Sequence, residues 1–168
     1  NIARLLAAGV PVVSGTTGWE DQLPSLAALA RARLGALLVD ANFSVGVHVM
    51  LHAARVMAEA FQPRPEFEGQ IVAAPHRQKR DAPSGTALSR QRAAREAGGR
   101  DVPVTSIRSG AVPGTHELRY EGPYESLALE HLARDRSVFG AGAVLAAEWL
   151  VGRTGVFTFE DVLFGRRA

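Results

Sequence analysis

Two short apolar runs that end in polar turns constrain the fold of this chain more than any other feature. The runs and turns are residues 10–14 followed by the 15–18 turn, and residues 36–39 followed by the 40–44 turn. Leu, Ala and Val recur at helical spacing after each turn, which predicts helices over 23–33 and 45–60. Repeated strand–turn–helix units are typical of a doubly wound parallel sheet, where ligands bind at the carboxyl ends of the strands. Both turns are therefore expected at one edge of one sheet.

The second half of the chain follows a different pattern, which begins after a Pro-rich hinge at residues 62–65. We expect strands over 70–74, 104–109, 115–120 and 126–133, and helices over 84–97, 139–151 and 158–163. The fold class is therefore α/β plus α+β, in which half of a doubly wound sheet precedes a domain with a mostly antiparallel sheet. The expected domain boundaries are 1–44, 45–150 and 151–168.

Composition excludes several classes of protein and site. The chain contains no Cys, so disulfides, thiol nucleophiles and Cys-ligated metals are absent. Its net charge of +2 leaves no basic footprint for nucleic acid. With no apolar run of 18 residues and no visible signal peptide, we expect a cytoplasmic protein. No metal site is expected either, because His48 and His52 have ligand spacing but lack a third ligand.

The densest group of chemically active residues lies at 75–86. Lys79 is the only Lys beside eighteen Arg, and an ammonium can release a proton that guanidinium hardly releases. Ser84, Gly85 and Thr86 open an expected helix, whose free backbone N–H groups and hydroxyls would bind an anion such as a carboxylate. His76 adds a nearby cation. The alternatives are a Ser N-cap preceded by a solvated basic loop, and chance survival of one Lys.

The two turns at the predicted sheet edge are the second candidate site. Gly15 allows a ligand close to the backbone, and Thr16 and Thr17 supply hydroxyls for a ribose, an amide or a phosphate. The 40–44 turn is similar in position and polarity. An ordinary tight turn would also use Gly and Thr, and Ser44 or Asn42 could simply cap the following helix.

Five segments together identify a family. In chain order they are residues 13–19, 41–47, 76–87, 108–117 and 139–144. These segments resemble 4-hydroxy-tetrahydrodipicolinate reductase, also called dihydrodipicolinate reductase, of bacterial lysine biosynthesis. The resemblance extends over nearly the whole chain. Its most specific part is the run from Lys79 through Asp81-Ala82-Pro83-Ser84-Gly85 to Thr86, whereas the 15–18 turn is common to many folds.

The resemblance implies a fold, a reaction and site residues. It implies a Rossmann-type cofactor domain, followed by a substrate domain whose sheet forms a homotetramer. The implied reaction reduces a cyclic imine dicarboxylate with NADH or NADPH, in which hydride goes to a ring carbon and Lys79 donates a proton. Residues with implied binding roles are Gly15, Thr16, Thr17, Asp40, Ala41, Asn42 and Phe43 for the cofactor, and His76, Lys79, Ser84, Gly85 and Thr86 for the substrate.

Two departures from the family pattern bear on activity. The family begins with a Gly-rich phosphate loop that is not in this sequence, and residue 1 is Asn, so we expect a fragment that binds dinucleotide poorly. The family also has Glu-Ala-His-His where this chain has Ala73-Ala74-Pro75-His76, so Pro75 replaces a titratable His. Either Lys79 transfers the proton alone, or His76 assists, or the chain is catalytically impaired. The alternative to an enzyme fragment is a non-catalytic dicarboxylate-binding or assembly module derived from the same family.

Overall fold

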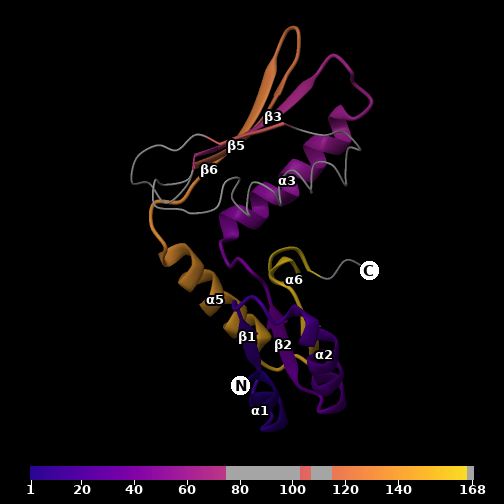
Figure 1. The fold of residues 1–168 in the computed structure, drawn as a ribbon, viewed down its shortest axis with the longest axis vertical. Coiled ribbons are helices and arrows are strands. Elements are labelled where there is room, and N and C mark those ends of the chain that lie inside the picture. The colour runs from indigo at the N-terminus through magenta and orange to yellow at the C-terminus, as the bar shows by residue number, and fades with distance from the viewer. Residues whose placement is uncertain (75–102, 107–114, 166–168) are drawn as a thin grey trace. The chain divides into compact units, whose positions relative to one another are not determined.

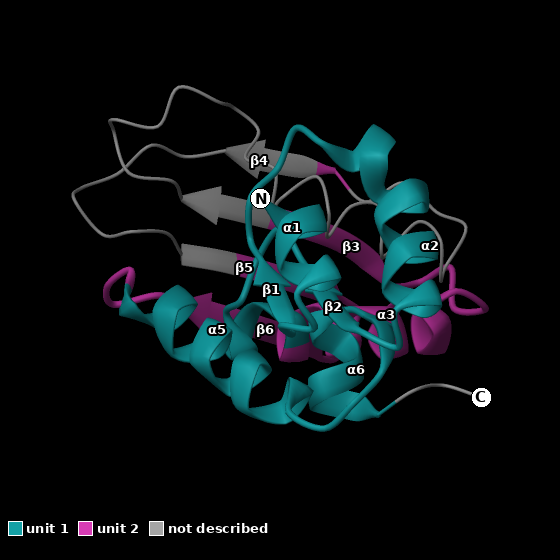
Figure 2. Cartoon of the chain, turned by 90° about the horizontal axis from the view of Figure 1, so that it is seen from below, with its two compact units in different colours: residues 1–48, 137–168 teal, residues 49–136 magenta. Residues whose placement is uncertain are grey.

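The computed structural model describes residues 1–74, 103–106 and 115–165, and it divides the chain into two compact units (Figures 1 and 2). Unit 1 comprises residues 1–48 and 137–168, and unit 2 comprises residues 49–136. The elements of unit 1 are α1 (Ile2–Ala7), β1 (Val12–Ser14), the 3₁₀ helix η1 (Glu20–Gln22), α2 (Leu23–Ala32), β2 (Ala36–Val39), α5 (Ser137–Leu150), β7 (Gly155–Phe157) and α6 (Phe159–Phe164). Those of unit 2 are β3 (Glu68–Ala74), β4 (Val104–Ser106), β5 (Thr115–Glu121) and β6 (Ser126–Leu132), while α3 (Val45–Phe61) begins in unit 1 and continues into unit 2.

Unit 1 is a parallel sheet with helices on both faces. Its strand order is β1-β2-β7, and both pairings are parallel. The side chains of β2 alternate between the faces, as the period of a strand requires. Leu37 joins the core beneath α1 and α2, whereas Ala36 and Leu38 join the core formed with α5 and α6. This alternation leaves the strand buried on both sides, which explains its uninterrupted apolar sequence.

The C-terminal residues of unit 1 return to its sheet. β7 pairs with β2, and α6 follows it at once. α6 begins with a capping box, in which Thr158 accepts a hydrogen bond from the backbone N–H of Asp161 and the Asp161 carboxylate accepts one from the backbone N–H of Thr158. Phe159, the first residue of α6, is fully buried. The cap therefore fixes where α6 starts, and with it the position of Phe159.

In the part of the chain that the structure describes, unit 2 is a four-stranded sheet packed against α3. Its strand order is β4-β3-β5-β6, with β3 parallel to β4 and the other two pairings antiparallel. The buried core contains Met50, Ala54, Met57 and Ala58 of α3 together with Ile71, Leu118 and Tyr120 of the sheet. Alternate residues of β5 carry charge instead: Arg119 bonds to Glu117 at 2.6 Å and to Glu121 at 3.1 Å. Along β5, therefore, apolar residues face the core beneath α3 and charged residues face the other side.

The predicted mixture of α and β structure is confirmed, with a parallel sheet in one unit and a mostly antiparallel sheet in the other. Strand β7, which has only three residues, was not predicted from the sequence. The two compact units meet within α3 and before α5, because α5 packs on the sheet of unit 1, and the domain boundaries expected at 44/45 and 150/151 stay predictions. The expected helix over 84–97 lies outside the described residues.

Candidate functional site

The two turns singled out in the sequence meet at the carboxyl edge of the parallel sheet in unit 1. β1 ends at Ser14 and β2 ends at Val39, in register with each other. A cavity of about 260 Å³ lies between the turns that follow. Its lining is Thr16, Thr17, Trp19, Glu20, Leu23, Val39, Asp40 and Ala41. The sequence pattern thus predicted correctly that both turns would occupy the same edge.

The 15–18 turn is held by the two residues that follow it. The Trp19 indole Nε1 donates a hydrogen bond to the Thr16 carbonyl at 2.7 Å. The Glu20 carboxylate accepts from the Gly18 backbone N–H at 2.9 and 3.1 Å. The backbone N–H groups of Glu20 and Gly18 lower the pKa of the Glu20 carboxyl, so Glu20 carries its negative charge at neutral pH. Gly18 itself has φ of +88°, which favours glycine at this position.

Gly15 brings the two turns into contact. A Cβ atom at Gly15 would lie 3.2 Å from Cε2 of the Phe43 ring, closer than most such contacts. Phe43 is itself buried in the core that β2 shares with α5 and α6. The absence of a side chain at Gly15 therefore lets the ring of one turn pack against the backbone of the other.

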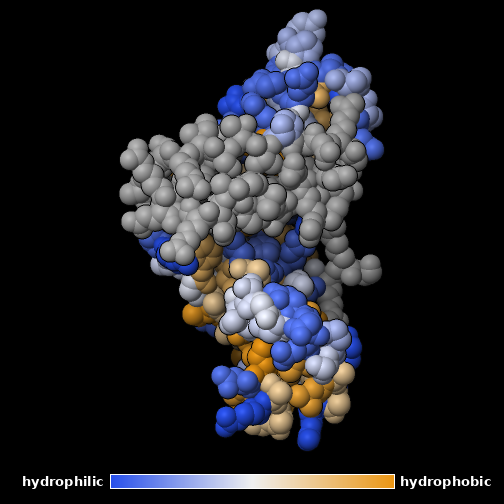
Figure 3. Space-filling view, in the orientation of Figure 1, coloured by the Kyte–Doolittle hydropathy of each residue, from blue (hydrophilic) through white to orange (hydrophobic). Residues whose placement is uncertain are grey.

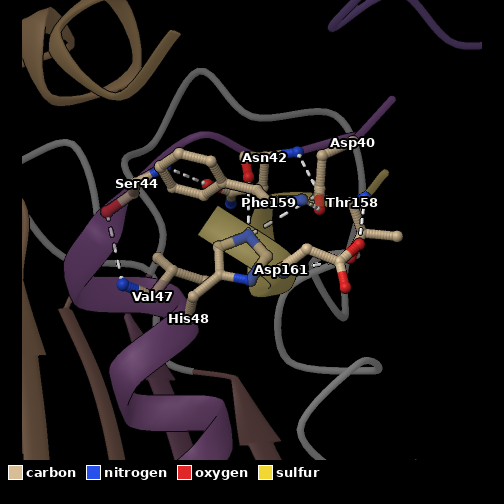
Figure 4. Close-up of polar contacts among 8 residues, drawn as sticks. All are labelled: Asp40, Asn42, Ser44, Val47, His48, Thr158, Phe159 and Asp161. Atoms are coloured by element: carbon tan, nitrogen blue, oxygen red, sulfur yellow. Dashed lines mark hydrogen bonds and ion pairs between the residues drawn. The ribbon is translucent and has the colours of Figure 1, made fainter. Parts of the chain in front are cut away.

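The 40–44 turn is built from hydrogen bonds between side chains and backbone (Figure 4). Asp40 Oδ1 accepts from the Asn42 backbone N–H at 3.1 Å, and Asp40 Oδ2 accepts from the Phe159 N–H at 3.2 Å. Asn42 Oδ1 accepts from the Ser44 N–H at 2.8 Å, and Ser44 Oγ caps α3 through the Val47 N–H at 3.3 Å. The capping alternative for Ser44 is thus confirmed, and it coexists with a cavity beside Asp40 and Ala41.

His48 contacts this turn, a role that was not predicted from the sequence. Its Nε2 donates to the Asn42 carbonyl at 2.7 Å and lies 3.6 Å from Asp40 Oδ1. The ring is buried and packs edge-on against Phe159, with 5.1 Å between centroids. The available signal was its place in the first turn of α3, because helical side chains lean back toward the N-terminus.

Charges around His48 determine its titration. Burial lowers the pKa of His48, but Asp40, the Asn42 carbonyl and the negative charge of Glu160 together outweigh it, so the pKa is raised. Because Nε2 carries a proton in order to donate to the Asn42 carbonyl, the neutral ring has a bare Nδ1. Within the described part of the chain, this buried Nδ1 has no hydrogen-bond partner.

The electrostatics of the cavity between the turns restrict what it can bind. Among the residues that the structure describes, its lining includes the carboxylates of Glu20 and Asp40, and no Lys or Arg. Such a surface repels phosphate and suits an uncharged or cationic polar group. Both carboxylates accept backbone hydrogen bonds and keep further acceptor capacity, and the lining also includes Thr16 and Thr17, whose hydroxyls can bind a ligand.

Several predicted residues fall outside the described part of the chain. They are His76, Lys79, Ser84, Gly85 and Thr86, together with Pro75, so their roles stay predictions. Among the described residues, no group of His, Cys, Asp or Glu could hold a metal ion. The same residues include no helix that is both long and apolar enough to span a membrane.

Residues 46–163 match the family model for the dihydrodipicolinate reductase C-terminus. The chain belongs to the dihydrodipicolinate reductase family. Relatives called 4-hydroxy-tetrahydrodipicolinate reductase match over nearly the whole chain. The protein of Natronomonas pharaonis is 41% identical, covering 97% of this chain and 72% of its own length. That of Christiangramia forsetii is 34% identical, covering 97% and 73%, and that of Thiobacillus denitrificans is 36% identical, covering 92% and 65%.

A solved structure of the family has the same fold. The dipicolinate-bound dihydrodipicolinate reductase of Paenisporosarcina superposes with a TM-score of 0.82 and 22% sequence identity. The match covers 94% of this chain and 66% of that one. The chain therefore spans about two thirds of the length of its relatives, and the resemblance inferred from its sequence motifs is confirmed.

Proposed function

We propose that this chain is the larger, C-terminal part of a reductase that uses NADH or NADPH to convert 4-hydroxy-tetrahydrodipicolinate to tetrahydrodipicolinate in lysine biosynthesis. Family membership supports the reaction class. The observation that carries the proposal within the structure is the cavity where the 15–18 and 40–44 turns meet. Under this proposal unit 1 is part of a Rossmann-type cofactor domain, unit 2 is the substrate domain, and the protein is cytoplasmic.

The cavity fits one part of a nicotinamide dinucleotide. It is smaller than the roughly 300–1,000 Å³ of pockets that enclose whole ligands. Its acidic lining disfavours the pyrophosphate but accommodates the nicotinamide ring and ribose, which carry amide and hydroxyl groups. Gly15, Thr16 and Thr17 would hold this end from one side, and backbone atoms of Asp40, Ala41, Asn42 and Phe43 from the other. When bound, the cofactor supplies the hydride.

Unit 1 also has a surface that fits a larger cofactor domain. Helix α5 is apolar on most of its sides. Val144 of this helix is 58% exposed, and Val151, which directly follows the helix, is 74% exposed. Hydrophobic residues appear in orange on the face of unit 1 seen in Figure 3. A helix with apolar residues all round is typical of the interior of a larger protein. This surface supports a cofactor domain that is larger than unit 1.

The substrate chemistry is assigned to residues 76–86. Ser84, Gly85 and Thr86 would bind one carboxylate of the substrate through backbone N–H groups and hydroxyls, with His76 contributing a cation or a donor. Lys79 would donate the proton that completes the reduction. The alternative is a non-catalytic dicarboxylate-binding or assembly module, which Pro75 favours because it removes a titratable group from this segment.

Replacing Thr86 by Ala tests the carboxylate site. Losing one charge-assisted hydrogen bond should weaken the binding of pyridine dicarboxylates by about ten- to a hundredfold. Isothermal titration calorimetry measures the affinity, and Thr86→Ser is the control that keeps the hydroxyl and should keep the affinity. Equal affinity of the Ala variant and the parent would place the anion site elsewhere.

We also propose that unit 2 mediates a homotetramer. Among the described strands of its sheet, β6 lies at one edge, and it exposes Leu132, which is 50% accessible. Sedimentation equilibrium should show a tetramer, and Leu132→Asp should shift the population to smaller species. Leu34→Asp, which changes an exposed Leu in unit 1, is the control and should leave the mass unchanged. A monomeric parent protein would contradict this assembly.

A further inference from the structure

The Asp40 carboxylate is the centre of the contacts that shape the 40–44 turn. One oxygen binds the Asn42 N–H within the turn, and the other binds the Phe159 N–H at the start of α6. Residues 40 and 159 are far apart in the sequence, so this carboxylate joins the end of β2 to the C-terminal helix. The same residue lines the cavity between the two turns. The conformation of the turn therefore depends on where this carboxylate is held.

His48 provides a further contact to the same turn, from α3. Its Nε2 donates to the Asn42 carbonyl and faces Asp40 Oδ1, while the edge of its ring packs on Phe159. Figure 4 shows the imidazole directed at the turn, between Asn42 and the start of α6. A half-buried carbonyl that loses its donor is only partly rehydrated, so this contact constrains Asn42 more than an exposed hydrogen bond would.

We propose that His48 is a positioning residue, which holds the 40–44 turn, through the Asn42 carbonyl and the Asp40 carboxylate, in the conformation that receives the nicotinamide end of the cofactor. The part of this inference that concerns cofactor rests on the proposed function. The part that concerns the turn rests on contacts within unit 1 alone. His48 does not reach the cavity lining, so it acts through Asn42 and Asp40 rather than by touching the ligand.

The hydrogen bond from His48 to the Asn42 carbonyl is available in both protonation states of the imidazole. The charged groups that face His48 are Asp40 at the end of β2 and Glu160 on α6, and they favour the protonated ring. Both the neutral Nε2–H form and the protonated form keep a proton on Nε2, so both donate to Asn42. A catalytic acid, in contrast, would impose its own titration on turnover. The pH profile therefore separates positioning from proton transfer.

Two variants of similar size isolate the Nε2 donor. His48→Gln places an amide N–H where Nε2 lies, whereas His48→Leu keeps the bulk against Phe159 and removes the donor. Amide hydrogen exchange of this chain reports on the turn through the N–H groups of Asn42 and Phe159, both bound to Asp40. We expect exchange of both to be roughly tenfold faster in the Leu variant and close to the parent rate in the Gln variant.

Controls make the result specific. His52→Leu alters the next helical turn of α3, and the Gly122 N–H, bound to the Glu125 carbonyl in the β5–β6 hairpin, is a distant reporter. The exchange rates of the Asn42 and Phe159 amides should not change in the His52 variant. The exchange rate of the Gly122 amide should not change in any variant. If the Leu variant does not fold, His48→Asn replaces it, because the shorter amide stops short of the Asn42 carbonyl. Unchanged exchange on removing the donor, or equal acceleration by Gln, overturns the inference.

Kinetics of the complete protein that contains this chain test the consequence for cofactor. The Leu variant should raise KM for NADH or NADPH by roughly five- to tenfold with little change in kcat, and Gln should restore KM. The pH profile of kcat should be the same in the parent and in His48→Gln. A profile altered by Gln, or unchanged KM in an active Leu variant, overturns the positioning role. An inactive parent would refute the reductase proposal, while the exchange experiment would still decide the role of His48.

Discussion

Gly142→Ala is expected to destabilise unit 1 by about 3 kcal/mol or more, at the upper end of overpacking effects. Gly142 lies on the buried side of α5, and a Cβ atom there would overlap the backbone carbonyl of Phe43 and lie 3.2 Å from the Phe159 ring. A backbone carbonyl cannot rotate away as a side chain can. Helix α5 would have to move off the 40–44 turn, and natural domains have only about 5–15 kcal/mol of stability in total.

Gly140→Ala is the matched control for this prediction. It lies one half-turn earlier in α5, and a Cβ atom there would meet nothing within 4 Å. Because Ala is a better helix former than Gly, this variant should gain about 0.5–1 kcal/mol. Urea unfolding followed by far-UV circular dichroism measures both. Similar free energies of unfolding for the two variants would mean that α5 does not pack closely against the 40–44 turn at Gly142.

Lys79→Arg should lower kcat of the complete reductase by about 10²–10⁴, the usual effect of losing a positioned acid. Arg keeps the positive charge and much of the length, so KM for the dicarboxylate substrate should change little. Its guanidinium, however, hardly releases a proton. If Lys79 served only to neutralise a carboxylate, Arg would be a tolerable replacement and kcat would fall little. Steady-state rates of parent and variant separate the two roles.

Periodicity made much of the fold predictable. Uninterrupted apolar runs at β1 and β2 indicated strands buried on both faces, and the structure places α1 and α2 on one face and α5 and α6 on the other. Parallel pairing then required both turns to lie at one edge. β7 could not be predicted in this way, because three residues show no period and their strand conformation depends on pairing with β2.

The candidate site was predictable in position but not in its connections. Gly, Thr, Asp and Asn after two strands indicated the turns at residues 15–18 and 40–44. The contacts that hold them come from distant parts of the chain. The Phe159 backbone N–H donates to the Asp40 carboxylate, and the lack of a side chain at Gly142 leaves room for the Phe43 carbonyl. The contacts made by Phe159 and Gly142 leave no local pattern in the sequence. His48 was interpreted only with His52 as a helix pair, although its place in the first turn of α3 allowed it to face the 40–44 turn.

The most direct test of the proposed function is a reductase assay of the complete protein that contains this chain. Purified protein, freshly generated 4-hydroxy-tetrahydrodipicolinate and either NADH or NADPH are mixed, and nicotinamide oxidation is followed by absorbance. The reductase account predicts substrate-dependent oxidation with at least one of the two cofactors, despite Pro75. A folded protein that binds pyridine dicarboxylate but oxidises neither cofactor would contradict it and would favour the non-catalytic binding module.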